Sequence, residues 1–231
     1  MQRSERRPKL VALVPMRHES ERVPGKNYRL LAGRPLYSYI LETLRSCPEV
    51  EQIVVDTDSP PIRKGVKEGF PEVLLLERPD HLRDGNVPMN EVLLHDAGAA
   101  EASFYLQTHS TNPLLRADTV AQAIARFFEA YPRHDSLFSV TRLQQRLWDA
   151  RVQPVNHDPN VLIRTQDLPP MYVENSCLYL FEREGFLERR NRIGRTPMLF
   201  EIAAEEAWDL DNEIDFRLAE SLLGERADKE V

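Results

Sequence analysis

Cysteine is scarce in this chain, and long apolar runs are missing from it. The 231 residues include two cysteines, Cys47 and Cys177, which lie far apart in the sequence. This usage suits a reducing compartment and excludes both a disulfide framework and a cysteine-based zinc site. The apolar run near the N-terminus has about six residues, fewer than a signal-peptide core, and no stretch approaches the ~18 residues of a membrane span. We therefore expect a cytoplasmic protein with no membrane partner.

Positive charge is also in short supply. The chain has 30 Lys and Arg against 37 Asp and Glu, a net charge of −7, which argues against nucleic acid as a partner. Neither the G-x-x-x-x-G-K-[ST] nor the G-x-G-x-x-G phosphate-binding pattern is present. Any phosphate site must therefore use side-chain cations and loop amides. The 42% hydrophobic content supports a buried core, and the length suits one α/β domain with a small appendage.

Apolar runs alternate with helix-like patterns along most of the chain. This alternation predicts a three-layer α/β/α, Rossmann-like fold with a mostly parallel sheet. The predicted strands are residues 9–14, 52–56, 73–76, 103–107, 136–141, 176–181 and 206–210, and the predicted helices are residues 36–45, 61–68, 89–101, 118–131, 183–189 and 213–223. Residues 142–172 are rich in proline and have little helical period, so we expect an inserted lobe there. The α/β domain then comprises residues 1–141 and 173–231.

A cationic loop follows the first predicted strand and carries Arg17, Arg22 and Lys26. Sheets of this class bind ligands at the carboxyl ends of their strands. Arginine offers a planar fork of donors and lysine a mobile point charge, so the loop suits a polyphosphate. A solvated basic turn accounts for the charge spacing equally well.

Asp209 and Asp211 form a second chemical signal near the C-terminus. In an extended segment these two side chains point to the same side. Two adjacent carboxylates raise each other's pKa unless a cation lies between them, and Mg²⁺ prefers such oxygen ligands. We expect Mg²⁺ here, with Mn²⁺ as the alternative, while a capped helix entry is the competing explanation.

Two further polar segments end predicted strands. Asp56 and Asp58 follow the second strand, where turn formation, helix capping and metal ligation all remain open. Residues 107–112 are consecutive polar residues after another strand, as a small-molecule site requires.

The pattern R-x-x-S-x-R-x-P-x-K-N, which begins at Arg17, resembles the N-terminal signature of the acylneuraminate (CMP-sialic acid synthetase-like) cytidylyltransferase family. Five later segments agree with this family in order. The resemblance implies an enzyme that activates a nine-carbon 2-keto-3-deoxy sugar acid, sialic acid or a relative, with CTP to give a CMP-sugar and pyrophosphate. It also implies a homodimer, in which the lobe at residues 142–172 mediates dimerisation and reaches over the partner's sugar site.

The resemblance further assigns roles to individual residues. It implies that Arg17 and Lys26 stabilise charge on the triphosphate, and that Asp209 and Asp211 bind the metal ion. We expect Asp211, a water or a phosphate oxygen to accept the proton of the attacking hydroxyl. The residues that match nucleotide-binding positions are Arg17, Ser20, Arg22, Lys26, Asn27 and Arg78, the last of which reads the cytosine ring. The expected sugar-acid contacts are Gln107, Ser110, Arg164, Gln166, Asn175 and Tyr179.

Three positions depart from the family pattern. His109 stands where the family has no residue, Val173 replaces an arginine that helps to hold the substrate in sialic-acid enzymes, and Ser176 replaces a glycine. Arg164 is a candidate replacement for the lost arginine. The alternatives are a cytidylyltransferase for the eight-carbon (KDO-type) acid and a catalytically silent nucleotide-binding regulatory protein. A methylerythritol-pathway enzyme would need a glycine-rich first loop, which this chain lacks.

Overall fold

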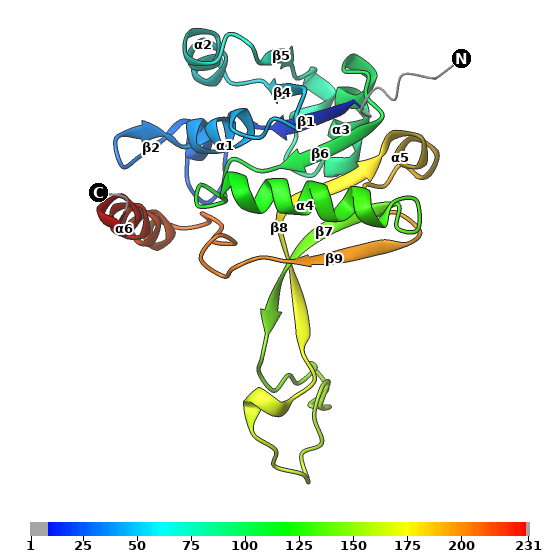
Figure 1. The fold of residues 1–231 in the computed structure, drawn as a ribbon. Coiled ribbons are helices and arrows are strands. Elements are labelled where there is room, and N and C mark those ends of the chain that lie inside the picture. The colour runs from blue at the N-terminus through cyan, green and yellow to red at the C-terminus, as the bar shows by residue number, and fades with distance from the viewer. Residues whose placement is uncertain (1–8, 230–231) are drawn as a thin grey trace.

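A seven-stranded sheet forms the centre of the computed structural model, which describes residues 9–229 and the side chains up to residue 226. Residues 1–8 and 230–231 of the predicted α/β domain lie outside the described residues. The strand order is β5-β4-β1-β6-β8-β7-β9, and only β8 runs against its neighbours. Helices cover both faces of the sheet (Figure 1). The prediction of a mostly parallel, Rossmann-like α/β sheet is confirmed.

The elements have the following bounds. The strands are β1 (Leu10–Pro15), β2 (Leu30–Leu31), β3 (Arg34–Pro35), β4 (Gln52–Thr57), β5 (Leu74–Glu77), β6 (Phe104–Thr108), β7 (Ser136–Leu143), β8 (Met171–Glu182) and β9 (Pro197–Glu201). The α-helices are α1 (Leu36–Arg45), α2 (Pro60–Gly69), α3 (Met89–Ala99), α4 (Ala117–Ala130), α5 (Arg183–Arg189) and α6 (Glu213–Lys229). Three 3-10 helices are η1 (Lys26–Tyr28), η2 (Asp80–Leu82) and η3 (Thr165–Asp167). Of the helices described, none is long and apolar enough to cross a membrane.

The central strand β1 is buried on both faces, as its continuous apolar run predicts. Alternate side chains, Leu10, Ala12 and Val14, pack on one face with α1, α2 and α4. Val11 and Leu13 pack on the other face with α3 and α5. A third apolar cluster seats α6 against the chain around β2. This packing places the segment before α6 at the edge of the sheet where the first loop lies.

Two parts of the predicted secondary structure are wrong. Residues 206–210 form turns and irregular backbone instead of a strand, because Glu206 turns inward to accept hydrogen bonds from Arg116 N and Thr119 Oγ1 at the start of α4. The edge strand β9 was not predicted. It begins at a proline and alternates between exposed and half-buried residues, so it lacks the apolar run of a central strand.

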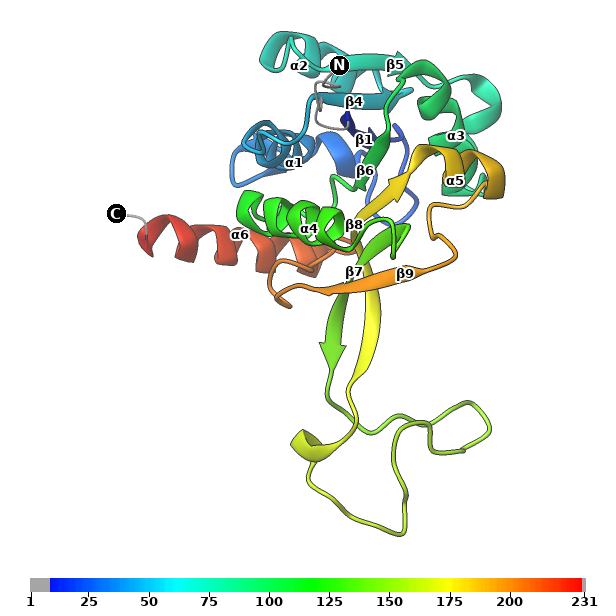
Figure 2. The same ribbon diagram turned by 45° about the vertical axis from the view of Figure 1, so that its right-hand side comes forward.

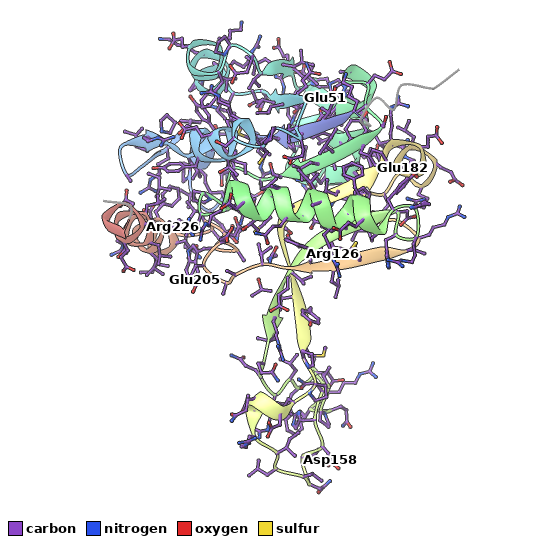
Figure 3. All side chains as sticks on the ribbon, in the orientation of Figure 1. Glu51, Arg126, Asp158, Glu182, Glu205 and Arg226 are labelled. Carbon is purple, nitrogen blue, oxygen red and sulfur yellow. The ribbon has the colours of Figure 1, made fainter. Side chains whose placement is uncertain are left out.

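Strands β7 and β8 continue past the body as a hairpin, and the chain between them forms an arm, residues 142–172. Figures 1 and 2 show this arm projecting away from the sheet, and Figure 3 places Asp158 at its far end. The arm and its base expose a series of large apolar side chains: Trp148, Val152, Val155, Val161, Leu162, Ile163, Tyr172 and Val173. A series of exposed apolar side chains on one projecting element is typical of an interaction site.

Candidate active site

A cavity of about 450 Å³ lies at the carboxyl ends of the central strands. Four segments line it: the first loop, the chain from Arg78 to Val92, residues 109–111 after β6, and the segment before α6. The predicted site residues that this cavity brings together are Arg17, Ser20, Arg22, Lys26, Asn27, Arg78, Ser110, Asp209 and Asp211.

The first loop is held in shape by its own backbone and by one amide. Gly25 has φ +66°, and a Cβ there would lie 2.7 Å from the Tyr28 ring, so the position requires glycine. Asn27 is buried, its Nδ2 donates to Arg17 O at 2.8 Å, and its Oδ1 accepts from Ser110 Oγ at 2.8 Å. Asn27 therefore braces the loop against the segment that follows β6.

Asp211 joins the first loop to the segment before α6. Arg22 Nη1 lies 2.8 Å from Asp211 Oδ2, and Lys26 Nζ lies 3.2 Å from Asp211 Oδ1 and 2.7 Å from Leu210 O. Asp215 in the first turn of α6 fixes this segment, since its carboxylate accepts from the amides of Asp211 and Asn212 at 2.8 and 2.7 Å. Three cations of the first loop, Arg17, Arg22 and Lys26, thus share the cavity with Asp209 and Asp211, and Glu21 and Asp84 also line it.

Asp209 lines the same cavity. Burial raises the pKa of its carboxyl group, and the charge of Asp211 raises it further, while Lys26 and Arg22 lower it. A divalent cation would relieve this desolvation and repulsion, and carboxylate oxygens are the ligands that Mg²⁺ takes. Asp209 and Asp211 therefore fit the metal site predicted for them.

Arg78 lines the cavity from the opposite wall and is 4% exposed. Its Nε donates to Asp56 Oδ1, an ion pair in which neither side chain is more than 5% exposed. Apolar side chains, Leu82, Met89 and Val92, line the cavity beside it. A fixed guanidinium beside an apolar wall suits a flat heterocycle with polar edges.

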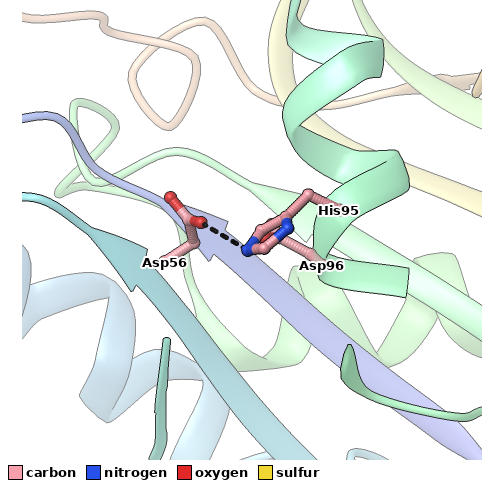
Figure 4. A group of neighbouring side chains, drawn as sticks. All are labelled: Asp56, His95 and Asp96. Atoms are coloured by element: carbon pink, nitrogen blue, oxygen red, sulfur yellow. Dashed lines mark ion pairs between the residues drawn. The ribbon is translucent and has the colours of Figure 1, made fainter. Parts of the chain in front are cut away.

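Behind Arg78, the side chains of Asp56, His95 and Asp96 form a group that could hold a metal ion, because one ligand atom from each lies within 4.8 Å of the others. Figure 4 shows the His95 ring facing Asp56, with Nε2 3.9 Å from Oδ2. The two carboxylates are fully buried, whereas His95 is partly exposed. A metal here would be separate from the Asp209–Asp211 pair.

A shared proton accounts for this group without a metal. Among the described residues, no N–H or neutral O–H donates to Asp56 Oδ2 or to either oxygen of Asp96. Burial and the neighbouring Asp56 raise the pKa of Asp96 well above its usual range. A neutral Asp96 would donate to Asp56 Oδ2 while Asp56 Oδ1 accepts from Arg78, and the charges of the three groups would then balance. Asp56 is thus a structural anchor for Arg78, and Asp58 likewise accepts from His18 N at 2.7 Å.

A second polar group adjoins the cavity on β6 and β8. Gln107 and Tyr179 are register partners, so their side chains share one face of the sheet. Gln107 Oε1 accepts from Arg192 Nη1 at 2.5 Å, and its Nε2 lies 2.9 Å from His109 Nε2. Burial, Arg192 and Lys26 lower the pKa of His109 to about 3, so a neutral imidazole accepts this bond. His109 lines the cavity and connects it to Gln107.

The remaining predicted sugar-acid residues lie outside the cavity. Asn175 bridges β7 and β8, accepting from Ser139 Oγ at 2.6 Å and donating to Thr141 Oγ1 at 2.9 Å. Arg164 and Gln166 are exposed on the arm, where Arg164 pairs with Asp167. Ser176 adopts φ +59°, the left-handed region, which explains a glycine at this position in the family pattern.

Sequence reasoning missed Arg192 and Asp96. Arg192 reaches Gln107 from the loop between α5 and β9, and Asp96 reaches Asp56 from α3. Arg192 lies among charged and polar residues, which give no local signal. Asp96 and His95 lie between apolar residues of α3, and an aspartate and a histidine in such a run could have marked them for attention.

Comparisons with known proteins agree with one another. The sequence matches the model of a family described as Cytidylyltransferase over residues 11–228. It is 24% identical over 216 residues to N-acylneuraminate cytidylyltransferase A of Danio rerio, covering 90% of this chain and 49% of that protein. It is 27% identical over 229 residues to CMP-N,N'-diacetyllegionaminic acid synthase of Legionella pneumophila, covering 93% and 96% of the two chains. The chain thus spans about half the length of the zebrafish relative and nearly all of the bacterial one.

The fold also has a close counterpart among solved structures. A structure of CMP:2-keto-3-deoxy-manno-octonic acid synthetase complexed with CTP superposes with a TM-score of 0.72 at 15% identity, covering 94% of this chain and 99% of the other. At this identity the likeness establishes a shared architecture.

Proposed function

This chain belongs to the cytidylyltransferase family, and on that premise we propose that it transfers the CMP group of CTP to a nine-carbon 2-keto-3-deoxy sugar acid, releasing pyrophosphate. The observation that carries the proposal is the meeting of the first-loop cations with Asp209 and Asp211 in one cavity, across a separation of 185 residues between Lys26 and Asp211. The relatives named for sialic and legionaminic acids favour the nine-carbon branch.

The nucleotide would lie between the two walls of the cavity. We assign the cytosine ring to the apolar wall beside Arg78, whose guanidinium is held by Asp56 and can donate to the polar edge of the base. The triphosphate would lie against Arg17 and Lys26, with Ser20 and Arg22 at its open side. Asn27 has its polar atoms engaged within the protein, so its role is to hold the loop in place.

The reaction requires an in-line displacement at the α-phosphorus. The anomeric oxygen of the sugar acid forms the new P–O bond, the bond to the pyrophosphate oxygen breaks, and the hydroxyl proton leaves. Arg17 and Lys26 stabilise the charge on the departing pyrophosphate, so their contribution is electrostatic. Asp211 is positioned in the same cavity to accept the proton.

Asp209 and Asp211 are the residues that would hold a divalent cation. When bound, Mg²⁺ would supply charge neutralisation on the phosphates and a lower pKa for the attacking hydroxyl. For Asp211 to serve in this way, it must exchange its contacts with Arg22 and Lys26 for the cation, which leaves both side chains free for phosphate oxygens.

The arm is proposed as the dimerisation element. Its exposed apolar side chains, among them Leu162 at 88% exposure, would be buried against a second copy of the chain. This arrangement would also bring the partner's Arg164 and the partner's Gln166 toward the sugar site, which neither residue reaches within one subunit. The sugar site would then be complete only in the dimer.

The test is pyrophosphate release by the full chain with CTP, Mg²⁺ and a panel of acids: N-acetylneuraminic acid, N,N'-diacetyllegionaminic acid and 3-deoxy-manno-octulosonic acid. We expect release with a nine-carbon acid and with CTP, and little release with UTP or ATP. Release with the eight-carbon acid alone would assign the alternative branch. Tight CTP binding without release from any acid would support the catalytically silent alternative and contradict the proposal.

A further inference from the structure

Arg192 is a partly buried cation whose surroundings differ from those of its neighbours. Arg189, Arg190 and Arg195 each form an ion pair with a carboxylate. Among the described residues, Arg192 forms none. Its guanidinium stacks 3.6 Å above the Tyr179 ring and donates to Gln107 Oε1 at 2.5 Å. A desolvated guanidinium that lacks an anionic partner is a site for an anion.

The protein holds this guanidinium in place before any ligand arrives. The Arg192 amide donates to Asn90 Oδ1 at 3.3 Å, which fixes the loop to the start of α3. Further along the same loop, Gly194 N donates to Ser136 Oγ at 2.8 Å, and Asp135 accepts from the amides of Arg195 and Thr196. Anchoring on both sides lowers the entropy that ligand binding would cost.

The neighbouring acid is already engaged elsewhere. The Glu174 carboxylate accepts from the Tyr179 hydroxyl and forms no ion pair with Arg192, although its charge partly offsets the lowering of the Arg192 pKa by burial. Gln107 uses its carbonyl on Arg192 and its amide on His109, which lines the nucleotide cavity. Two side chains, Gln107 and His109, therefore connect Arg192 to the cavity in which the α-phosphorus would react.

We propose that Arg192 binds the carboxylate of the sugar-acid substrate and takes the place of the arginine that is missing at Val173. This inference rests on the proposed function, because it names the group that recognises the acid. Arg164, the replacement considered from the sequence, is exposed on the arm and paired with Asp167. Arg192 gives the site a fork of donors for a carboxylate, so a neutral sugar of the same shape would bind poorly.

The experiment measures KM for N-acetylneuraminic acid and N,N'-diacetyllegionaminic acid, KM for CTP, and kcat in five proteins: the wild type, R192Q, R192K, R195Q and R164Q. In R192Q we expect KM for the acid to rise about 100-fold while KM for CTP changes less than about twofold. In R192K we expect KM for the acid to rise about tenfold, because the point charge of lysine replaces the fork of donors of arginine. R195Q removes a charge of the same sign three residues away, and its KM and kcat values should match those of the wild type.

A carboxamide analogue of the acid separates a direct contact from a structural effect. The wild type should bind the analogue about 100-fold more weakly than the acid, and R192Q should bind the two alike. Equal discrimination by both proteins would overturn the proposal, as would a KM increase in R164Q instead of R192Q.

Direct binding keeps this inference distinct from the proposed function. If the wild type binds an acid by calorimetry but releases no pyrophosphate, the proposed function fails, and the affinity of R192Q for that acid still decides the role of Arg192. If the wild type binds none of the acids, the proposal for Arg192 is overturned.

Discussion

Replacing Asp211 by asparagine should have opposite effects on CTP binding with and without metal. In the structure, Asp211 holds two cations that we assign to the triphosphate, Arg22 at 2.8 Å and Lys26 at 3.2 Å. The Arg22 side chain is 63% exposed, so its pair is worth at most about 0.2–1 kcal/mol. Lys26 is 11% exposed and Asp211 31% exposed, which places their pair near about 1 kcal/mol after screening.

Removing the Asp211 charge releases both cations and removes a repulsion with phosphate. Because CTP no longer has to break these two ion pairs, its binding gains about 1.4 kcal/mol, which corresponds to about tenfold tighter CTP binding in the presence of EDTA. With Mg²⁺, D211N lacks a carboxylate that we assign to the metal and to the proton, so turnover should fall at least about 100-fold. Calorimetry with CTP in EDTA and pyrophosphate release at saturating Mg²⁺ measure the two effects.

The matched control is E213Q, because Glu213 lies two residues away and pairs with Arg29 outside the cavity. It should change both measurements by less than about twofold. Weaker metal-free CTP binding by D211N, or near-normal turnover at saturating Mg²⁺, would refute the assignment of Asp211.

Three other substitutions test the pairing of Asp96 with Asp56, the dimerisation role of the arm, and the left-handed residue Ser176 in β8. Asp96 has a raised pKa in the folded state, so its contribution to stability is fully present below about pH 4 and is lost as pH rises through the folded pKa, at about 1.4 kcal/mol per pH unit over that window. D96N should remove this slope in urea unfolding measured from pH 5 to 8, and an unchanged slope would contradict a neutral Asp96. Leu162 is 88% exposed, so L162E should convert a dimer to a monomer in light scattering without lowering the melting temperature of the body. The control L30E, which changes an exposed leucine on the body, should leave the dimer intact. A monomeric wild type would contradict the arm's role. Ser176 has φ +59°, so S176G should raise the free energy of unfolding by about 1 kcal/mol, and destabilisation would show that the Ser176 hydroxyl matters more than its backbone.

Two helices, α1 and α5, begin and end where the sequence places them. In α1 the apolar positions Leu36, Ile40 and Leu44 recur on one face, which is the pattern of a helix packed on a core. The prediction of a strand at residues 206–210 was wrong because the local pattern does not determine the structure there. The conformation of this segment is set by distant partners, with Leu210 N bonded to Thr111 O and Glu206 bonded to the start of α4.

The candidate site divides in the same way. The first loop and the two late aspartates share residue types that suit one ligand, so the sequence could predict that they meet. The pairing of Arg78 with Asp56, and of Arg192 with Gln107, joins residues 22 and 85 positions apart. The family resemblance gave Arg78 a ligand role, and nothing in the sequence gave Arg192 one, because strand order and helix placement decide which charges become buried together.

One strand, β8, continues from the sheet of the body into the base of the arm (Figure 2). Its 12 residues span about 40 Å. Tyr179 lies in the part within the sheet, and Tyr172 lies at the base of the arm, with the irregular step opposite Phe138 and the left-handed Ser176 between them. In the proposed dimer, one continuous backbone would therefore connect the contacts of the arm to the Tyr179 ring and to the Arg192 guanidinium stacked on it.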